Sequence, residues 1–254
     1  MPTEPSLTDL SEVAAAFAVE DYLYFHQEFL PPERSEAETA AAVQMLQMEP
    51  PMRVLDLACG FGRIANRLAA RGFRVTGVEW LEGFLEMARQ EARQMGIRVE
   101  YIQGDMRRID YRAVFDRAIL MFNSFGYFSD EENLEVMRRV ARALKPGGKV
   151  GFDIANRDGV LNNFHAHYVL EKEGNLLINR FSFDVWTGRL HNARVVIRDG
   201  VRTDRPLSIR LYSLTEMRAL LTEAGLALEA AYEEWDGQPL QMDSPAMVII
   251  AGKP

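Results

Sequence analysis

The sequence predicts an α/β fold, with a mostly parallel sheet covered by helices on both faces. Three observations support this prediction. From about residue 51 to 156, short apolar runs typical of strands alternate with amphipathic segments typical of helices. A glycine-rich turn, Ala58-Cys59-Gly60-Phe61-Gly62, follows the first of these runs. From residue 161 to 211, apolar and polar residues alternate instead, which predicts antiparallel hairpins.

An N-terminal helical arm precedes this region. Residues 9–48 are amphipathic with a helical period, and Pro31-Pro32 divides them. Pro50-Pro51 ends the segment, because proline cannot continue a helix. We therefore expect residues 1–50 to form an arm or lid.

The core is expected to contain five strands and three helices before residue 160. Gly72 and Gly96 are placed to end two of the helices, and Ser129 with Glu132 forms a capping box that begins the third. The expected strands are residues 52–58, 73–79, 97–105, 115–122 and 149–156, and the expected helices are residues 63–71, 84–95 and 130–144. A turn is expected at "KPGG" before the fifth strand.

The second half of the chain is expected to hold an insertion and the end of the core. Turns at Thr187-Gly188 and Asp199-Gly200 mark hairpins, and a capping box at Ser213 begins a last helix. Two strands follow, near residues 226–234 and 246–251. The expected domains are a core of residues 51–160 and 212–254, and an antiparallel β insertion of residues 161–211 that either caps a substrate or mediates dimerisation.

Composition narrows the class of protein. The net charge of −8 over 254 residues argues against a broad nucleic-acid or anionic-membrane footprint. The single cysteine, Cys59, fits a reducing compartment. No signal peptide or long apolar run is evident, so we expect a cytoplasmic protein with no membrane association.

The glycine turn predicts a ligand site, because ligands of open α/β sheets bind beyond the carboxyl ends of the strands. Gly60-x-Gly62-x-x-Ala65 fits a dinucleotide fingerprint, with Glu79 placed for a ribose hydroxyl. However, Asp56 at the strand end would repel a pyrophosphate by about 4 kcal/mol at an effective dielectric near 20. S-adenosylmethionine carries an ammonium, a sulfonium and no phosphate, so Asp56 favours that cofactor.

Acidic and aromatic residues at the next strand ends agree with this interpretation. Glu79 can accept both ribose hydroxyls, and Asp105 can accept from the adenine amino group while Met106 covers the ring. Structural alternatives stay open: Asp56 as a helix cap, Glu79 as the partner of an arginine, and Asp105 as a turn acid. The fourth strand ends in "MFNSFGYF", residues 121–128, with aromatic side chains and one amide.

With these residues the chain resembles the class I (Rossmann-like) S-adenosylmethionine-dependent methyltransferases, particularly the bacterial small-molecule type. The resemblance covers residues 40–155 by motif and extends to the C-terminus by element order. It implies a seven-stranded sheet whose last strand is antiparallel, and S-adenosylmethionine as cofactor. The pattern departs from the family at Ala58, where a glycine is often found. The cofactor-binding residues it implies are Asp56, Ala58, Cys59, Gly60, Gly62, Glu79, Trp80, Asp105, Met106, Phe122 and Asn123.

The methyl acceptor is expected to be a small molecule with a nitrogen or oxygen nucleophile. Methyl transfer from a sulfonium is a direct displacement, so alignment supplies much of the rate and no obligatory catalytic residue is predicted. The loop after the fourth strand lacks the prolines typical of enzymes that methylate DNA bases. Residues of the arm, this loop and the end of the insertion are expected to bind the acceptor: Tyr22, Phe25, Arg34, Phe125, Tyr127, Arg210 and Tyr212.

Other interpretations are a NAD-dependent oxidoreductase on a similar fold and a non-catalytic cofactor-binding module. His165 and His167 have no third ligand at metal-like spacing, so no metal site is predicted. Trp186 is expected to pack within its hairpin. The strand edges of the insertion leave a homodimer as a further possibility.

Overall fold

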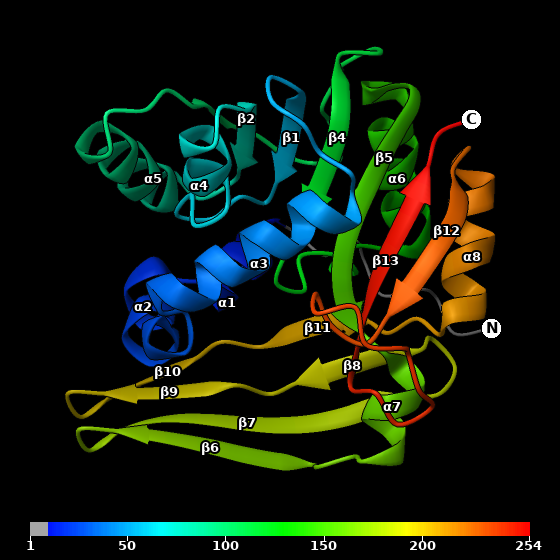
Figure 1. Cartoon of the computed structure of the whole chain (residues 1–254). Helices are drawn as coiled ribbons and strands as arrows, with labels where there is room; N and C mark the ends of the chain where they lie inside the picture. Colours follow the sequence, from blue (N-terminus) through cyan, green and yellow to red (C-terminus); the bar gives the residue numbers. More distant parts are fainter. Residues whose placement is uncertain (1–9) are drawn as a thin grey trace.

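The computed structural model describes residues 10–254 and contains a central seven-stranded sheet (Figure 1). Its strand order is β12-β13-β5-β4-β1-β2-β3. Strands β1 to β5 pair in parallel, whereas β13 runs antiparallel to both β5 and β12. The predicted sheet and its antiparallel last strand are therefore confirmed. The strands are β1 Arg53–Leu57, β2 Arg74–Glu79, β3 Glu100–Gln103, β4 Phe115–Leu120, β5 Leu144–Ala155, β12 Ala227–Tyr232 and β13 Ala246–Gly252.

Helices cover both faces of this sheet, because alternate strand residues point to opposite sides. Leu55 and Leu57 share a buried cluster with Val136 and Met137 of α6, whereas Val54 shares the opposite cluster with Leu68 of α4. The capping boxes predicted for α6 and α8 are both present. The helices are α4 Ala65–Ala70, α5 Glu82–Gln94, α6 Asp130–Ala143, α7 Arg157–Asn162 and α8 Leu214–Glu223.

The core differs from the prediction at two places. Strand β5 begins at Leu144, so the "KPGG" segment lies within it, and Gly147 takes a φ of 72° beside a register shift against β4. The short helix α7 was not predicted. Its N-cap is Asn156, whose side chain accepts from the amide of Asp158.

The insertion forms a second, antiparallel sheet below the carboxyl ends of β1, β4 and β5 (Figure 1). Its order is β10-β9-β7-β8-β11, with β6 paired to β7. The two predicted hairpin turns are confirmed, but Trp186 in the β7–β8 turn is 92% exposed, so its predicted packing was wrong. The strands are β6 His167–Lys172, β7 Asn175–Asp184, β8 Arg189–Asn192, β9 Val195–Arg198, β10 Val201–Asp204 and β11 Leu207–Arg210.

The arm is helical, as predicted, and residues 1–9 of it lie outside the described residues. It consists of α1 Leu10–Ala16, α2 Val19–His26, a 3₁₀ turn Gln27–Phe29 and α3 Pro32–Met45. Helix α3 packs on the central sheet, where its Leu46 cap lies in the same cluster as Val54. Helix α2 instead meets the second sheet (Figure 1). Within residues 10–254, no helix is long and apolar enough to cross a membrane.

Candidate functional site

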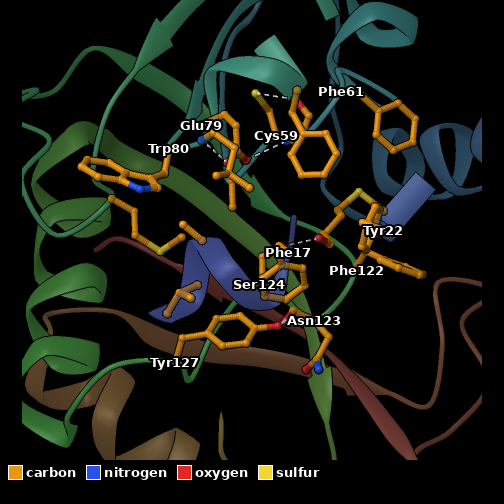
Figure 2. A pocket seen from close by; sticks show the side chains of 18 of the residues that line it. Phe17, Tyr22, Cys59, Phe61, Glu79, Trp80, Phe122, Asn123, Ser124 and Tyr127 are labelled. Carbon is orange, nitrogen blue, oxygen red and sulfur yellow. Dashed lines mark hydrogen bonds between the residues drawn. The ribbon is translucent and has the colours of Figure 1, made fainter. Parts of the chain in front are cut away.

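A cavity of about 560 Å³ lies between the carboxyl ends of the central strands, the arm and the second sheet (Figure 2). This volume is typical of small-molecule sites. All the predicted cofactor-binding residues except Gly62 line it. The arm contributes Phe17 and Tyr22, and the second sheet contributes Leu190 and Arg194. The insertion therefore forms one wall of the cavity, opposite the central strands, and we call this wall the roof.

Asp56 at the end of β1 is buried, with 3% of its surface exposed. The amide of Ala65 lies close enough to favour its charged form, but the N-cap of α4 is Ile64 and has no side-chain capping hydrogen bond, so the helix-cap alternative is not borne out. Burial raises the pKa of Asp56 to about 8, and Arg63 opposes this rise. The sequence argument treated this group as charged. The structure corrects it: without a ligand the carboxyl group keeps its proton at neutral pH, and a bound cation would favour its release.

Glu79 at the end of β2 is held in one orientation by two backbone amides. Its Oε2 accepts from the Gly60 amide at 3.0 Å, and its Oε1 accepts from the Leu81 amide at 2.9 Å. No arginine pairs with it among the described residues, so the ion-pair alternative was wrong. A side chain at Gly60 would meet nothing within 4 Å. The backbone there is open to a ligand, next to a carboxylate with lone pairs to spare.

The two ends of the glycine loop have different roles. Ala58 has a φ of 53°, the left-handed region that glycine adopts most easily, which explains why a glycine is common there. Gly62 has a φ of 80°, and a Cβ there would lie 2.4 Å from the Tyr101 hydroxyl and 2.8 Å from the Ala88 Cβ. Gly62 therefore permits close packing against β3 and α5 and does not line the cavity.

Asp105 and Met106 line the cavity beyond β3. The Asp105 carboxylate already accepts from the Arg107 side chain, at 2.9 and 3.1 Å, and from the Arg107 amide at 2.8 Å. The turn-acid alternative is therefore correct, and a ligand would share this carboxylate with Arg107. Trp80 lies at the cavity rim, 41% exposed (Figure 2).

The loop after β4 is held by Asp153 of β5, which the sequence analysis missed. The Asp153 carboxylate accepts from the amides of Phe122 and Asn123 at 2.8 and 2.9 Å, and from the Trp235 indole at 2.9 Å. Asn123 in turn accepts the Ala155 amide on its side-chain oxygen at 2.9 Å. Phe122 and Asn123 both have positive φ, so this network fixes a strained loop against the cavity.

Cys59 is a small, buried residue of the glycine loop. Its side chain is 8% exposed, and burial with the neighbouring carboxylates raises the pKa of its thiol. A thiol held neutral is a poor nucleophile. Within residues 10–254, no group of three His, Cys, Asp or Glu side chains is placed to hold a metal ion.

The predicted acceptor residues divide into two groups. Tyr22, Arg34 and Tyr127 line the cavity. Four others lie outside its lining, which corrects their placement: Phe25, Phe125, Arg210 and Tyr212. Phe25 of α2 packs against Leu177 and Val196 of the second sheet. Phe125 packs between Phe152 and Tyr212.

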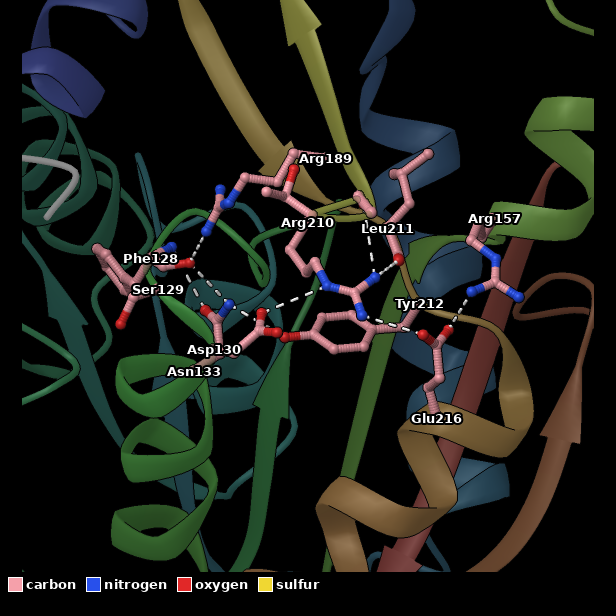
Figure 3. A network of polar contacts seen from close by, with 12 residues as sticks. Phe128, Ser129, Asp130, Asn133, Arg157, Arg189, Arg210, Leu211, Tyr212 and Glu216 are labelled. Carbon is pink, nitrogen blue, oxygen red and sulfur yellow. Dashed lines mark hydrogen bonds and ion pairs between the residues drawn. The ribbon is translucent and has the colours of Figure 1, made fainter. Parts of the chain in front are cut away.

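Arg210 and Tyr212 belong to a polar network that joins the second sheet to α6 and α8 (Figure 3). Arg210 pairs with Glu216 at 3.0 Å and with Asp130 at 3.3 Å. Arg157 pairs with the same Glu216 at 2.6 Å. The Tyr212 hydroxyl accepts from Asn133 at 3.1 Å. These residues hold the insertion on the core.

Replacing Glu216 with alanine is therefore expected to destabilise the protein by about 2–3 kcal/mol, because it removes a capping box and leaves Arg210 short of a partner. For a chain of this size we expect the melting temperature to fall by roughly 5–10 °C. Thermal unfolding checks this. Glu223→Ala is the matched control on the same helix, since its pair with Arg138 is exposed. Equal melting temperatures for the two variants would contradict the role given to Glu216.

Sequence comparisons agree with the site. The family model described as "Methyltransferase domain" matches residues 54–148. A putative methyltransferase, YqeM, of Bacillus subtilis is 28% identical over 192 residues, covering 69% of this chain and 74% of that protein. A dTDP-4-amino-2,3,4,6-tetradeoxy-D-glucose N,N-dimethyltransferase of Saccharopolyspora spinosa is 29% identical over 195 residues, covering 74% and 73%.

Structural comparison shows the same fold. An S-adenosylmethionine-dependent methyltransferase from Clostridium acetobutylicum superposes with a TM-score of 0.79 at 16% identity, covering 93% of this chain and 97% of that one. The glycine loop, the carboxylate at the end of β2 and the matched methyltransferase domain all lie in one region of the chain. The chain therefore contains a methyltransferase domain, matched over residues 54–148, and it has the Rossmann-like fold of S-adenosylmethionine-dependent methyltransferases.

Proposed function

We propose that this cavity holds S-adenosylmethionine against β1 and β2, and that the chain methylates a nitrogen or oxygen atom of a small molecule bound beneath the second sheet. The observation that carries the proposal is the Glu79 carboxylate, fixed by the Gly60 and Leu81 amides and facing the same cavity as Asp56. The cationic tail of a nucleoside such as S-adenosylmethionine would be attracted by these two acids, whereas a pyrophosphate would gain no such attraction.

The residues present fit this cofactor. Glu79 has free lone pairs for two ribose hydroxyls, and Gly60 leaves room for close approach. Asp56 and Arg63 are near enough to influence each other electrostatically, so together they suit an ammonium and a carboxylate on one amino-acid tail. Trp80 and Met106 offer apolar surface for the adenine ring. The bound cofactor supplies an activated methyl group on sulfur.

The acceptor space lies between the arm and the second sheet. Phe17 and Tyr22 come from the arm and Tyr127 from the loop after β4, whereas Leu190 and Ile209 come from the second sheet. Phe17 meets the Tyr127 ring edge-on at 5.5 Å. This enclosed, largely apolar space suits a small molecule rather than a polymer. The Saccharopolyspora relative, named for a small amino sugar, supports this class of acceptor.

The proposal also covers the partners, the cellular location and the oligomeric state of the protein. The net charge of −8 argues against a nucleic-acid partner, and the single cysteine agrees with a cytoplasmic location. A homodimer through the exposed edges of β6 and β10 stays a prediction.

His26 is placed to receive a proton when the acceptor must lose one. Its Nδ1 lies 3.0 Å from the Tyr22 carbonyl oxygen, which can only accept, so Nδ1 carries the hydrogen and Nε2 keeps a lone pair. The ring lines the cavity, stacks on Tyr22 at 4.8 Å, and has Arg194 as its charged neighbour. Burial lowers the pKa of His26 below 6.5. The ring is therefore neutral, and able to act as a base, at neutral pH.

Replacing His26 with glutamine is expected to lower kcat about 10²–10⁴-fold for an acceptor that loses its proton during transfer. The wild-type rate should be constant near neutral pH and fall as pH drops and His26 becomes protonated. Cofactor affinity should be unchanged. His191→Gln, on the exposed side of β8, is the control and should keep full activity. A His26→Gln enzyme with a normal rate and pH profile would rule out this role.

The proposed function is tested by incubating the protein with S-adenosylmethionine labelled in its methyl group and a metabolite extract. Label is expected in one or a few small molecules, and its transfer should require Glu79. The matched control is the Glu79→Gln protein. Transfer only to nucleic acid, or none with any fraction, would contradict the proposal.

A further inference from the structure

Arg194, between β8 and β9, places a guanidinium in the cavity with no acid beside it. It lines the cavity and donates to the Asn179 side-chain oxygen at 3.0 Å and to the Ala16 carbonyl at 3.2 Å. Both of these partners are neutral. Among residues 10–254, no carboxylate lies within 4.0 Å of it. Arg34 and Arg63, the other arginines of the lining, both pair with Glu38.

The guanidinium is held in place rather than free to turn away. Asn179, 4% exposed, also accepts from Asn192 at 2.7 Å, so its oxygen is fixed between two donors. Burial lowers the pKa of Arg194, although a guanidinium remains charged in proteins. A charge partly withdrawn from water without a counterion is unfavourable. An anion in the cavity would remove that penalty.

Tyr22 and Tyr127 surround the same position. Each is close enough to Arg194 for the guanidinium to lower the pKa of its phenol, although burial outweighs this effect. Burial raises the pKa of Tyr22 to about 12, so its hydroxyl stays a donor. The Tyr127 hydroxyl donates to the Asn123 carbonyl at 2.8 Å, whereas Tyr22 lines the cavity. Arg194 and Tyr22 therefore offer donors to one ligand.

The cofactor does not need this guanidinium. Its carboxylate could share the guanidinium of Arg63 with Glu38, because Arg63 follows the glycine loop and acts electrostatically on Asp56. Arg194 comes from the roof, among the residues assigned above to the acceptor. On the proposed function, we propose that Arg194 binds an anionic group, a carboxylate or a phosphate, carried by the methyl acceptor.

Calorimetry on protein saturated with S-adenosylhomocysteine tests this inference. The probes are benzoate and phenyl phosphate, with benzyl alcohol as the neutral equivalent. At least one anion should bind at least tenfold more tightly than the alcohol, and more weakly as salt is added. The preferred probe distinguishes a carboxylate from a phosphate.

Arg194→Gln should lose at least tenfold in anion affinity, and Arg194→Lys should lose less. Both variants should bind S-adenosylhomocysteine within twofold of wild type. Arg202→Gln is the matched control, because Arg202 lies on β10 of the same sheet and pairs with Asp204 at the surface. It should change neither affinity. If Arg194→Gln fails to fold, the lysine variant and the salt dependence of the wild type carry the test.

Three results would overturn the inference. The first is wild-type protein that binds S-adenosylhomocysteine but none of the anions better than the alcohol. The second is an Arg194→Gln protein that keeps its anion affinity. The third is a loss of S-adenosylhomocysteine affinity above tenfold in that variant, because Arg194 would then serve the cofactor. Failure of the wild type to bind S-adenosylhomocysteine at all would instead refute the proposed function itself.

Discussion

Replacing Glu79 with glutamine is expected to weaken binding of S-adenosylmethionine and S-adenosylhomocysteine by about a hundredfold. Hydrogen bonds to a charged group contribute about 1.5–3 kcal/mol each, and two ribose hydroxyls would lose that charge. A total near 3 kcal/mol corresponds to about two factors of ten in affinity. One amide, of Gly60 or Leu81, would also face the glutamine nitrogen and lose its acceptor.

Titration calorimetry with S-adenosylhomocysteine measures this effect, and thermal unfolding confirms that the variant is folded. Glu82→Gln is the matched control, because Glu82 begins α5, is partly exposed and, within residues 10–254, has Arg89 as its ion-pair partner. It should bind as wild type. A Glu79→Gln protein with affinity within threefold of wild type would remove Glu79 from the cofactor site.

Replacing Asp56 with asparagine is expected to stabilise the ligand-free protein while weakening cofactor binding. The folded-state pKa is about 8 and the ordinary value is 3.8, so the folded state holds a proton that the unfolded chain has released. The free energy of unfolding therefore falls as pH rises from about 4 to 8, by at most about 1.4 kcal/mol per pH unit. Asparagine does not titrate, and its oxygen can still accept the Ala65 amide.

The stability gained by the asparagine variant should be about 3 kcal/mol larger at pH 8 than at pH 5, which is roughly 5–10 °C in melting temperature. At pH 5 the two proteins should differ much less. Affinity for S-adenosylmethionine should fall about tenfold at pH 8, since a charge-assisted hydrogen bond to the ammonium is lost.

Thermal unfolding at both pH values and calorimetry at pH 8 measure these opposite changes. Asp110→Asn is the control, because Asp110 is exposed. A variant that is less stable and binds the cofactor as tightly as wild type would show that Asp56 supports the fold and does not bind the cofactor.

Local patterns in the sequence predicted the elements that depend on neighbouring residues. The capping boxes at Ser129 and Ser213 and the turn at Asp199-Gly200 are set by residues three or fewer positions apart. The glycine loop and Glu79 were also accessible, because consecutive parallel strands end at the same edge of a sheet.

Contacts between distant segments were not accessible in the same way. Arg210 ends a strand that leads toward the site, yet Glu216 and Asp130 hold its side chain outside the cavity. Tyr212 is held there by Asn133. Arg194 meets Ala16, which is 178 positions away, and nothing near it in sequence indicates this contact. Asp153 was visible as an acid near a strand end, but its three donors come from two other segments.

The most direct measurement is calorimetric titration of the wild-type protein with S-adenosylhomocysteine and, separately, with NADH. Asp56 becomes charged beside a cationic ligand, whereas the Glu79 carboxylate should repel a pyrophosphate. We therefore expect saturable micromolar binding of the first ligand and no measurable binding of the second. Binding of NADH at comparable affinity, or no heat with S-adenosylhomocysteine, would contradict the account.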